Sequence, residues 1–192
     1  MRRDRIRGQA ELLVMSATHS RQRDWSADVF DAMAARGIGT VCTIPDGGLT
    51  RLLNLVKADR AMRLVTLTTE EEAIGIVTGL WLGGKRAMVA IQSSGVGNCI
   101  NALGYPTLLR APLLMLVTMR GQWGEFNPWQ MPMGQATRAV LEAMAVRCFP
   151  VDVGTEVGET FAAAADMAFN GQQSVAVLVG QRIVGAKGFG QK

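Results

Sequence analysis

Short apolar stretches typical of strands alternate with helix-like stretches about six times along the chain, and this alternation limits the fold more than any other feature. The predicted strands cover residues 40–44, 63–68, 87–92, 112–118, 146–151 and 174–179. The predicted helices cover residues 24–36, 46–56, 70–82, 98–109, 135–145 and 155–169. Several strands are apolar at consecutive positions, which is typical of a parallel sheet covered on both faces. The pattern therefore predicts an α/β fold, an open doubly wound parallel sheet of about six strands with helices on both faces.

The length of 192 residues fits a single folded domain. We expect a flexible basic extension over residues 1–23, one domain over 24–185 and a short tail over 186–192. The extension holds six arginines against two acidic residues, so the rest of the chain is nearly neutral and nucleic acid is not an expected partner. No apolar run is long enough for a membrane helix, and the amino end lacks the features of a signal peptide. We therefore expect a cytoplasmic protein without a membrane partner.

Histidine and cysteine are too sparse for two common kinds of site. The only histidine is His19, in the predicted extension, and three cysteines are widely separated, without a CxxC pair. This composition predicts no transition-metal site and no Ser-His-Asp mechanism within the folded part. Acid–base chemistry would have to come from carboxylates, from a cofactor or from another chain.

Parallel sheets of this kind bind ligands at the carboxyl ends of their strands. Four segments are expected to lie there: residues 45–48, 68–71, 93–98 and 119–134. The first candidate residue is Glu70, at the start of a predicted helix. Thr69 and Glu72 also match a capping box, a local role that would account for Glu72 and leave Glu70 nearest to the ligand.

The segment Gln92–Asn98 is read as a small-residue loop that can present backbone N–H groups to a ligand. It does not match a dinucleotide fingerprint, because its third glycine would fall at Ile100, and it lacks the Gly-Lys-Ser/Thr of a Walker loop. A tight turn that serves only helix packing stays an equal alternative.

The segment 119–130 is a long predicted loop that contains two tryptophans and a phenylalanine. Long loops in compact domains are usually functional, and these aromatic residues favour a lid or a subunit contact. Arg120 directly follows a strand, where it could bind an anionic group or pair with Glu125.

Taken together, these segments resemble the pyrimidine-binding (PYR) domain of thiamine-diphosphate enzymes. The resemblance rests on Glu70-x-x-Ala73, Gly79, Gly84-Lys85 and Ser93-Ser94-Gly95-Val96-Gly97-Asn98-x-x-Asn101. The variant Gln-Ser-Ser-Gly-x-Gly-Asn, the turn Ile44-Pro45-Asp46, Arg120-Gly121 and Asn127-Pro128-x-Gln130 are similar to the sulfopyruvate and phosphonopyruvate decarboxylase branch. Acetolactate synthase-like enzymes usually carry Gly-Pro-Gly where this chain has Gly95-Val96-Gly97.

The resemblance implies a set of site residues. Glu70 would be catalytic, since the matching glutamate hydrogen-bonds N1′ of the aminopyrimidine and favours its imino tautomer; to share a proton it has to be partly buried. The implied cofactor contacts are Pro45, Glu70, Ser94, Gly95, Val96, Gly97 and Asn98. The implied substrate contacts are Arg120, Gln122 and Gln130. Many relatives have a histidine where this chain has Thr69, so one polar group of the family site is missing.

The resemblance also implies thiamine diphosphate and Mg2+ as cofactors, with the diphosphate and the metal held by a partner. Relatives bind them with a Gly-Asp-Gly motif in a second (PP) domain, and this chain has no Gly-Asp-Gly. The expected partner is a PP-domain (β) subunit in a hetero-oligomer. The chain would then be the α subunit of a decarboxylase that converts a 2-oxo acid of the sulfopyruvate or phosphonopyruvate type into an aldehyde and CO2.

Three other functions stay open at this stage. One is a subunit of an acyloin lyase or synthase, or of an aromatic 2-oxo acid decarboxylase, which the aromatic loop residues favour. Another is a non-catalytic scaffolding subunit with the same fold. A nucleotide-binding doubly wound domain is the third, and the failed glycine motifs disfavour it.

Overall fold

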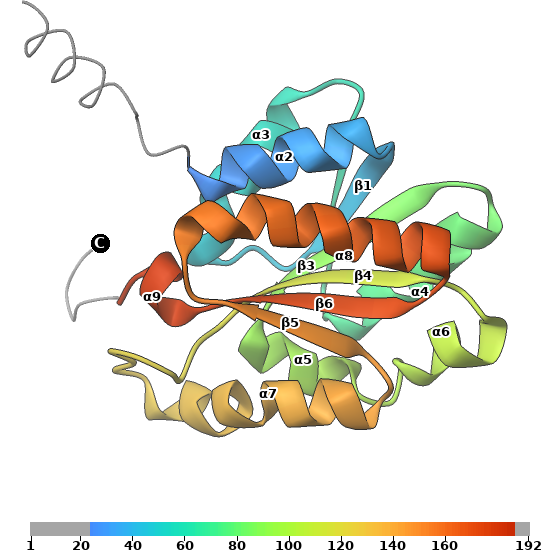
Figure 1. Cartoon of the computed structure of the whole chain (residues 1–192). Helices are drawn as coiled ribbons and strands as arrows, with labels where there is room; N and C mark the ends of the chain where they lie inside the picture. The colour runs from blue at the N-terminus through green and yellow to red at the C-terminus, as the bar shows by residue number, and fades with distance from the viewer. Residues whose placement is uncertain (1–23, 187–192) are drawn as a thin grey trace, which may run out of the picture.

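The computed structural model describes residues 24–186; predictions for residues 1–23 and for the tail beyond 186 lie outside this range. Its centre is one sheet of six parallel strands in the order β2-β1-β3-β4-β6-β5 (Figure 1). The strands are β1 (Ile38–Thr43), β2 (Arg63–Thr66), β3 (Arg86–Gln92), β4 (Leu113–Thr118), β5 (Arg147–Val151) and β6 (Ser174–Val179). The predicted α/β fold is confirmed.

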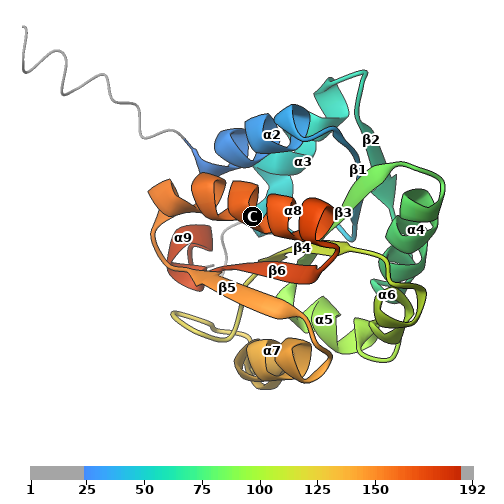
Figure 2. The same ribbon diagram turned by 45° about the vertical axis from the view of Figure 1, so that its right-hand side comes forward.

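Helices cover both faces of the sheet, as Figures 1 and 2 show. On one face lie α2 (Trp25–Ala35), α3 (Thr50–Ala58) and α8 (Val157–Gly171). On the other face lie α4 (Glu71–Leu82), α5 (Ser93–Cys99), α6 (Gly104–Leu109) and α7 (Met131–Ala143). Each layer has its own apolar core against the sheet, and every residue of the central strand β4 is buried. Burial on both faces explains the apolar strand sequences.

Four short helical segments complete the described chain. They are η1 (Gly47–Leu49), η2 (Pro128–Gln130), η3 (Gly154–Glu156) and α9 (Gln181–Val184). The segment α9 follows β6 at the carboxyl edge of the sheet and was not predicted from the sequence. Within the described range, every helix is too short or too polar to cross a bilayer.

The prediction of a loop over residues 93–97 was wrong, because α5 begins at Ser93 directly after β3. Glycine is a poor helix former, and two glycines in five residues suggested a loop. Here the glycines serve packing: a Cβ on Gly95 would lie 2.5 Å from Glu70, and one on Gly97 would lie 3.1 Å from Met133. Close contacts with α4 and α7 outweigh the local preference.

The direction in which the chain adds strands to the sheet changes twice. After β1 the chain goes outward to β2 and then returns to the other side of β1 as β3. After β4 it goes to the far edge as β5 and returns to lie between β4 and β5 as β6. The connections after the neighbouring strands β1 and β3 leave in opposite directions, and such a pair opens a crevice beyond the strand ends, which is where ligands bind in such folds.

Candidate functional site

A pocket of about 570 Å³ lies beyond the carboxyl end of β3, between the start of α4, α5 and the η2–α7 segment. It is lined by Glu70, Ser94, Gly95, Asn98, Pro128, Trp129, Pro132 and Met133. One wall is polar and comes from α4 and α5, whereas the facing wall is apolar and comes from η2 and α7. Such a pocket can accept a flat ring with a polar edge.

Glu70 is the acidic side chain of this pocket. It is half-buried at the residue before α4, and Asn98 Nδ2 donates a 2.7 Å hydrogen bond to its Oε2. The other carboxylate oxygen, Oε1, lies so close to Gly95 that a Cβ there would be 2.5 Å away. The absent side chain at Gly95 is therefore what lets the carboxylate lie against α5.

Glu72 accounts for the local capping of α4. Its Oε2 accepts a hydrogen bond of 3.2 Å from the backbone N–H of Thr68, and its own N–H donates to the Thr69 carbonyl oxygen at 3.3 Å. Glu70 makes no side-chain capping bond. The Glu70 carboxylate therefore does not cap α4 and is available to a ligand.

A chain of hydrogen bonds leads from the β1 loop to this pocket. Ser94 Oγ donates to Gln92 Oε1, and Gln92 Nε2 donates to Asp46 Oδ1 at 2.8 Å. The second oxygen of Asp46 accepts from the Gly48 N–H at 2.9 Å and from Thr118 Oγ1 at 3.1 Å. Asp46 thereby connects the ends of β1, β3 and β4.

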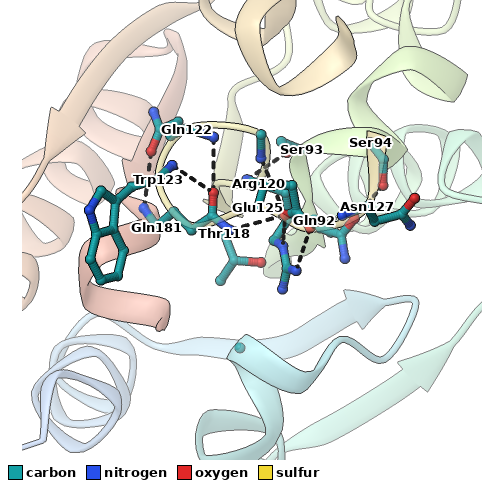
Figure 3. A network of polar contacts seen from close by, with 12 residues as sticks. Gln92, Ser93, Ser94, Thr118, Arg120, Gln122, Trp123, Glu125, Asn127 and Gln181 are labelled. Carbon is teal, nitrogen blue, oxygen red and sulfur yellow. Dashed lines mark hydrogen bonds and ion pairs between the residues drawn. The ribbon is translucent and has the colours of Figure 1, made fainter. Parts of the chain in front are cut away.

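A second polar network lies beyond the carboxyl ends of β4 and β6 (Figure 3). Arg120 and Glu125 form a two-bond ion pair, with Nε to Oε2 at 2.8 Å and Nη2 to Oε1 at 3.2 Å, and their side chains are only 2% and 1% exposed. The hydrogen bond from Arg120 is the main reason why the pKa of Glu125 is lowered to about 2. Arg120 Nη1 is buried and has no partner within residues 24–186.

Gln181 joins α9 to this network, as the dashed lines in Figure 3 show. Its Oε1 accepts from the N–H groups of Gln122 and Trp123, and its Nε2 donates to Glu125 Oε2 at 3.0 Å. Gln122 Oε1 in turn accepts from the Gln181 N–H at 3.0 Å. The sequence analysis missed Gln181, although its place directly after the last predicted strand was a usable signal.

Comparison with protein families matches residues 23–137 to the thiamine pyrophosphate enzyme family, N-terminal TPP binding domain. The chain belongs to this family. It is 32% identical over 155 residues to the sulfopyruvate decarboxylase subunit alpha of Methanococcus maripaludis, covering 80% of this chain and 93% of that one. It is 33% identical to the subunit of the same name from Methanothermobacter thermautotrophicus, covering 81% and 95%.

Two further similarities reach only part of the other protein. The phosphonopyruvate decarboxylase of Streptomyces viridochromogenes is 37% identical over 121 residues, which cover 61% of this chain and 30% of that enzyme. A 2-oxoglutarate:ferredoxin oxidoreductase from Magnetococcus marinus superposes with a TM-score of 0.65 at 15% identity, over 84% of this chain and 29% of that one. At this identity the second match supports the fold alone.

The structure brings together four of the residues that the resemblance to thiamine pyrophosphate enzymes implies, namely Glu70, Ser94, Gly95 and Asn98. Gly97 lies next to the pocket, against Met133. The side chain of Val96 is fully buried in the core, so only its backbone is available to a ligand. Pro45 is exposed and does not line the pocket.

The three residues implied as substrate contacts lie apart from Glu70. Arg120 and Gln122 belong to the β4–β6 network described above. Gln130 is half-buried at the end of η2, and its Oε1 has no hydrogen-bond partner within the described range. Arg120 therefore forms the ion pair with Glu125 that was predicted as the alternative to anion binding. Its Nη1 has no hydrogen-bond partner within the described range.

The pocket fits the pyrimidine end of thiamine diphosphate better than its diphosphate end. A carboxylate, an amide and a hydroxyl stand opposite the ring of Trp129 and the apolar side chain of Met133, which suits an aminopyrimidine ring. No lysine or arginine is among its lining residues, so a diphosphate would have no charge partner there. Residues 24–186 also hold no cluster of three acidic, histidine or cysteine side chains suited to a metal ion.

Proposed function

We propose that this chain is the pyrimidine-binding subunit of a heteromeric thiamine-diphosphate-dependent 2-oxo acid decarboxylase that forms an aldehyde and CO2. The observation that carries the proposal is the half-buried Glu70 carboxylate, set against Gly95 in a pocket that combines one polar and one apolar wall. The names of the relatives, sulfopyruvate and phosphonopyruvate decarboxylase, support the reaction type.

In this proposal Glu70 shares a proton with the ring nitrogen of the aminopyrimidine. Asn98 holds one oxygen of the carboxylate, which leaves Oε1 for the ring. Trp129 and Met133 pack against the face of the ring, and the backbone of Gly95–Gly97 borders its edge. Thiamine diphosphate, when bound, supplies the electron sink that decarboxylation needs.

A partner subunit has to complete the site. We propose that a cytoplasmic PP-domain (β) subunit carrying a Gly-Asp-Gly motif holds the diphosphate and Mg2+, because the pocket of this chain lacks the charges for both. The words "subunit alpha" in the names of the relatives support a hetero-oligomer. The cofactor would then lie between the two subunits.

For the substrate, we propose a short 2-oxo acid with a terminal sulfonate or phosphonate. Arg120 is the candidate for its anionic group, because its Nη1 is buried and finds no hydrogen-bond partner among residues 24–186. Gln122 and Gln130 are the candidate polar contacts. The 84% exposed ring of Trp129 at the pocket favours an aromatic 2-oxo acid as the second candidate.

The test is a pull-down of the tagged chain from its native lysate, followed by assays of the purified complex. We expect a stoichiometric partner that contains Gly-Asp-Gly, and turnover of sulfopyruvate or phosphonopyruvate that depends on thiamine diphosphate and Mg2+. Preference for phenylpyruvate would move the substrate to the aromatic class. If the chain is recovered alone and has no thiamine-dependent activity, the non-catalytic scaffolding subunit becomes the favoured function.

A further inference from the structure

The Asp46–Gln92–Ser94 chain of hydrogen bonds has a fixed direction, and this direction decides how Ser94 can meet a ligand. Both oxygens of Asp46 act as hydrogen-bond acceptors. The Gly48 N–H and Thr118 Oγ1 occupy Oδ2, and Gln92 faces Oδ1 at 2.8 Å. Gln92 must therefore turn its Nε2 toward Asp46.

The orientation of Gln92 then fixes that of Ser94. With Nε2 committed to Asp46, Gln92 presents Oε1 to Ser94, and the amide oxygen can only accept. The single O–H of Ser94 therefore donates to Gln92 Oε1. Since Ser94 lines the pocket beside Glu70, its Oγ faces the pocket with lone pairs only.

We propose that Ser94 acts as an obligatory hydrogen-bond acceptor toward the bound ligand and that Asp46, through Gln92, is the residue that sets this polarity. The group it recognises is an N–H donor on the amino edge of the cofactor ring, because a 2-oxo acid has no hydroxyl group to donate. Ser94 is thus a ligand-contacting residue, and Asp46 and Gln92 are positioning residues. The identity of the ligand rests on the proposed function.

Asp46→Asn reverses the direction of the hydrogen bonds from Asp46 through Gln92 to Ser94 without removing any of them. The Gly48 N–H can only donate, so the asparagine has to keep its oxygen there and turn its NH2 group toward Gln92. Gln92 then flips its amide, Nε2 faces Ser94, and the serine O–H is released toward the pocket. The variant presents a donor where the wild type presents an acceptor.

The experiment uses the complex purified on the tagged chain and two titrations. One measures the Kd of thiamine diphosphate by calorimetry, and the other measures the KM of the 2-oxo acid at saturating cofactor. Ser94→Ala and Asp46→Asn are each expected to raise the Kd of thiamine diphosphate by about tenfold, the effect of losing one hydrogen bond. A change in KM alone, with an unchanged Kd, would contradict the cofactor ring as the donor.

The double variant separates an effect of the hydrogen-bond direction at Ser94 from general structural damage. If Asp46 acts only through Ser94, Asp46→Asn has no further effect in the Ser94→Ala background. Thr118→Val is the matched control: it removes one bond to Asp46 but leaves the carboxylate, so it should lower Tm without changing either constant.

Additive effects of Asp46→Asn and Ser94→Ala, or unchanged constants in both variants, would overturn this inference while leaving the proposed function intact. A wild-type complex that binds no thiamine diphosphate would instead overturn the proposed function, and with it the ligand assigned to Ser94.

Discussion

At the residue scale, Glu70→Gln tests the central assignment of the site. Glutamine keeps the size of the side chain and an oxygen that can accept from Asn98, so the pocket should keep its shape. It cannot share a proton with a ring nitrogen as a carboxylate does. We expect kcat of the complex to fall by about 10²-fold or more, with Tm unchanged.

The control is the neighbouring Glu71→Gln. Glu71 is exposed on the first turn of α4 and lies outside the pocket, so kcat should be close to that of the wild type. A larger loss in Glu71→Gln than in Glu70→Gln would move the catalytic role by one residue. Wild-type activity in both would favour a scaffolding subunit.

Glu125→Gln tests the buried ion pair between Arg120 and Glu125. The change leaves the Arg120 guanidinium buried without a counter-charge, and breaking a buried pair in this way costs about 3–5 kcal/mol. Urea unfolding of the full chain at neutral pH should show a loss of that order. Glu142→Gln, which removes the partner of Arg138 in an exposed pair, should change stability by less than about 1 kcal/mol.

The same ion pair predicts how stability depends on pH. The pKa of Glu125 is lowered from 4.5 to about 2 in the folded chain, so its contribution is complete above pH 4.5 and is lost as pH falls toward 2. The difference in unfolding free energy between wild type and Glu125→Gln should therefore be smaller at pH 3 than at pH 7. A difference that is constant over this range would show that Glu125 titrates normally.

At the scale of single elements, α5 contains Gly95 at a position where helix propensity alone would favour alanine. Gly95→Ala should favour the helix by up to about 1 kcal/mol, but its Cβ would lie 2.5 Å from Glu70 Oε1 and displace the carboxylate. We expect lower kcat and a weaker Asn98 contact. In Gly75→Ala on α4 the new Cβ meets no atom within 4 Å, so this control should raise Tm of the full chain. Equal behaviour of the two variants would contradict the role of Gly95.

The same helix shows what the sequence could and could not predict. Strands such as β4 and β6 were predicted to within one residue, because continuous apolar sequence directly reflects burial on both faces. The start of α5 was not, since it depends on contacts with residues far away in sequence. Gln92 and Ser94 could be placed near a ligand from their motif, whereas the direction of their hydrogen bonds depends on Asp46, 46 residues from Gln92.

Arg120 illustrates the same limit in the second polar network. Its position after a strand correctly predicted the carboxyl edge of the sheet, and Glu125 was the predicted alternative partner. Its partner Glu125 also accepts a hydrogen bond from Gln181, which reaches it from α9 across 56 positions of sequence. Long-range contacts of this kind leave no periodic pattern.

At the scale of the whole molecule, the two reversals of strand order place two polar networks along one edge of the sheet. The first contains Glu70 and the chain from Asp46 to Ser94; the second contains Arg120, Glu125 and Gln181. The segment 121–130 connects them, because it begins in the second network and ends at η2, which lines the pocket.

An exposed aromatic ring marks the face on which a partner should close the pocket. Trp129 is 84% exposed, although it lines the pocket beside Asn98, and a large ring in such a place is typical of an interface. If the PP-domain subunit covers the pocket, Trp129→Ser should raise the Kd between the subunits by about 10- to 100-fold, a loss typical of an interface anchor. The wild-type chain should also show a blue shift of tryptophan emission on assembly that is absent in Trp129→Phe. The matched control is Leu108→Ser on α6, 78% exposed and outside the pocket, which should leave the Kd unchanged. If Leu108→Ser dissociates the complex and Trp129→Ser does not, the partner binds the α6 side, and the cofactor cannot lie between the subunits at Glu70.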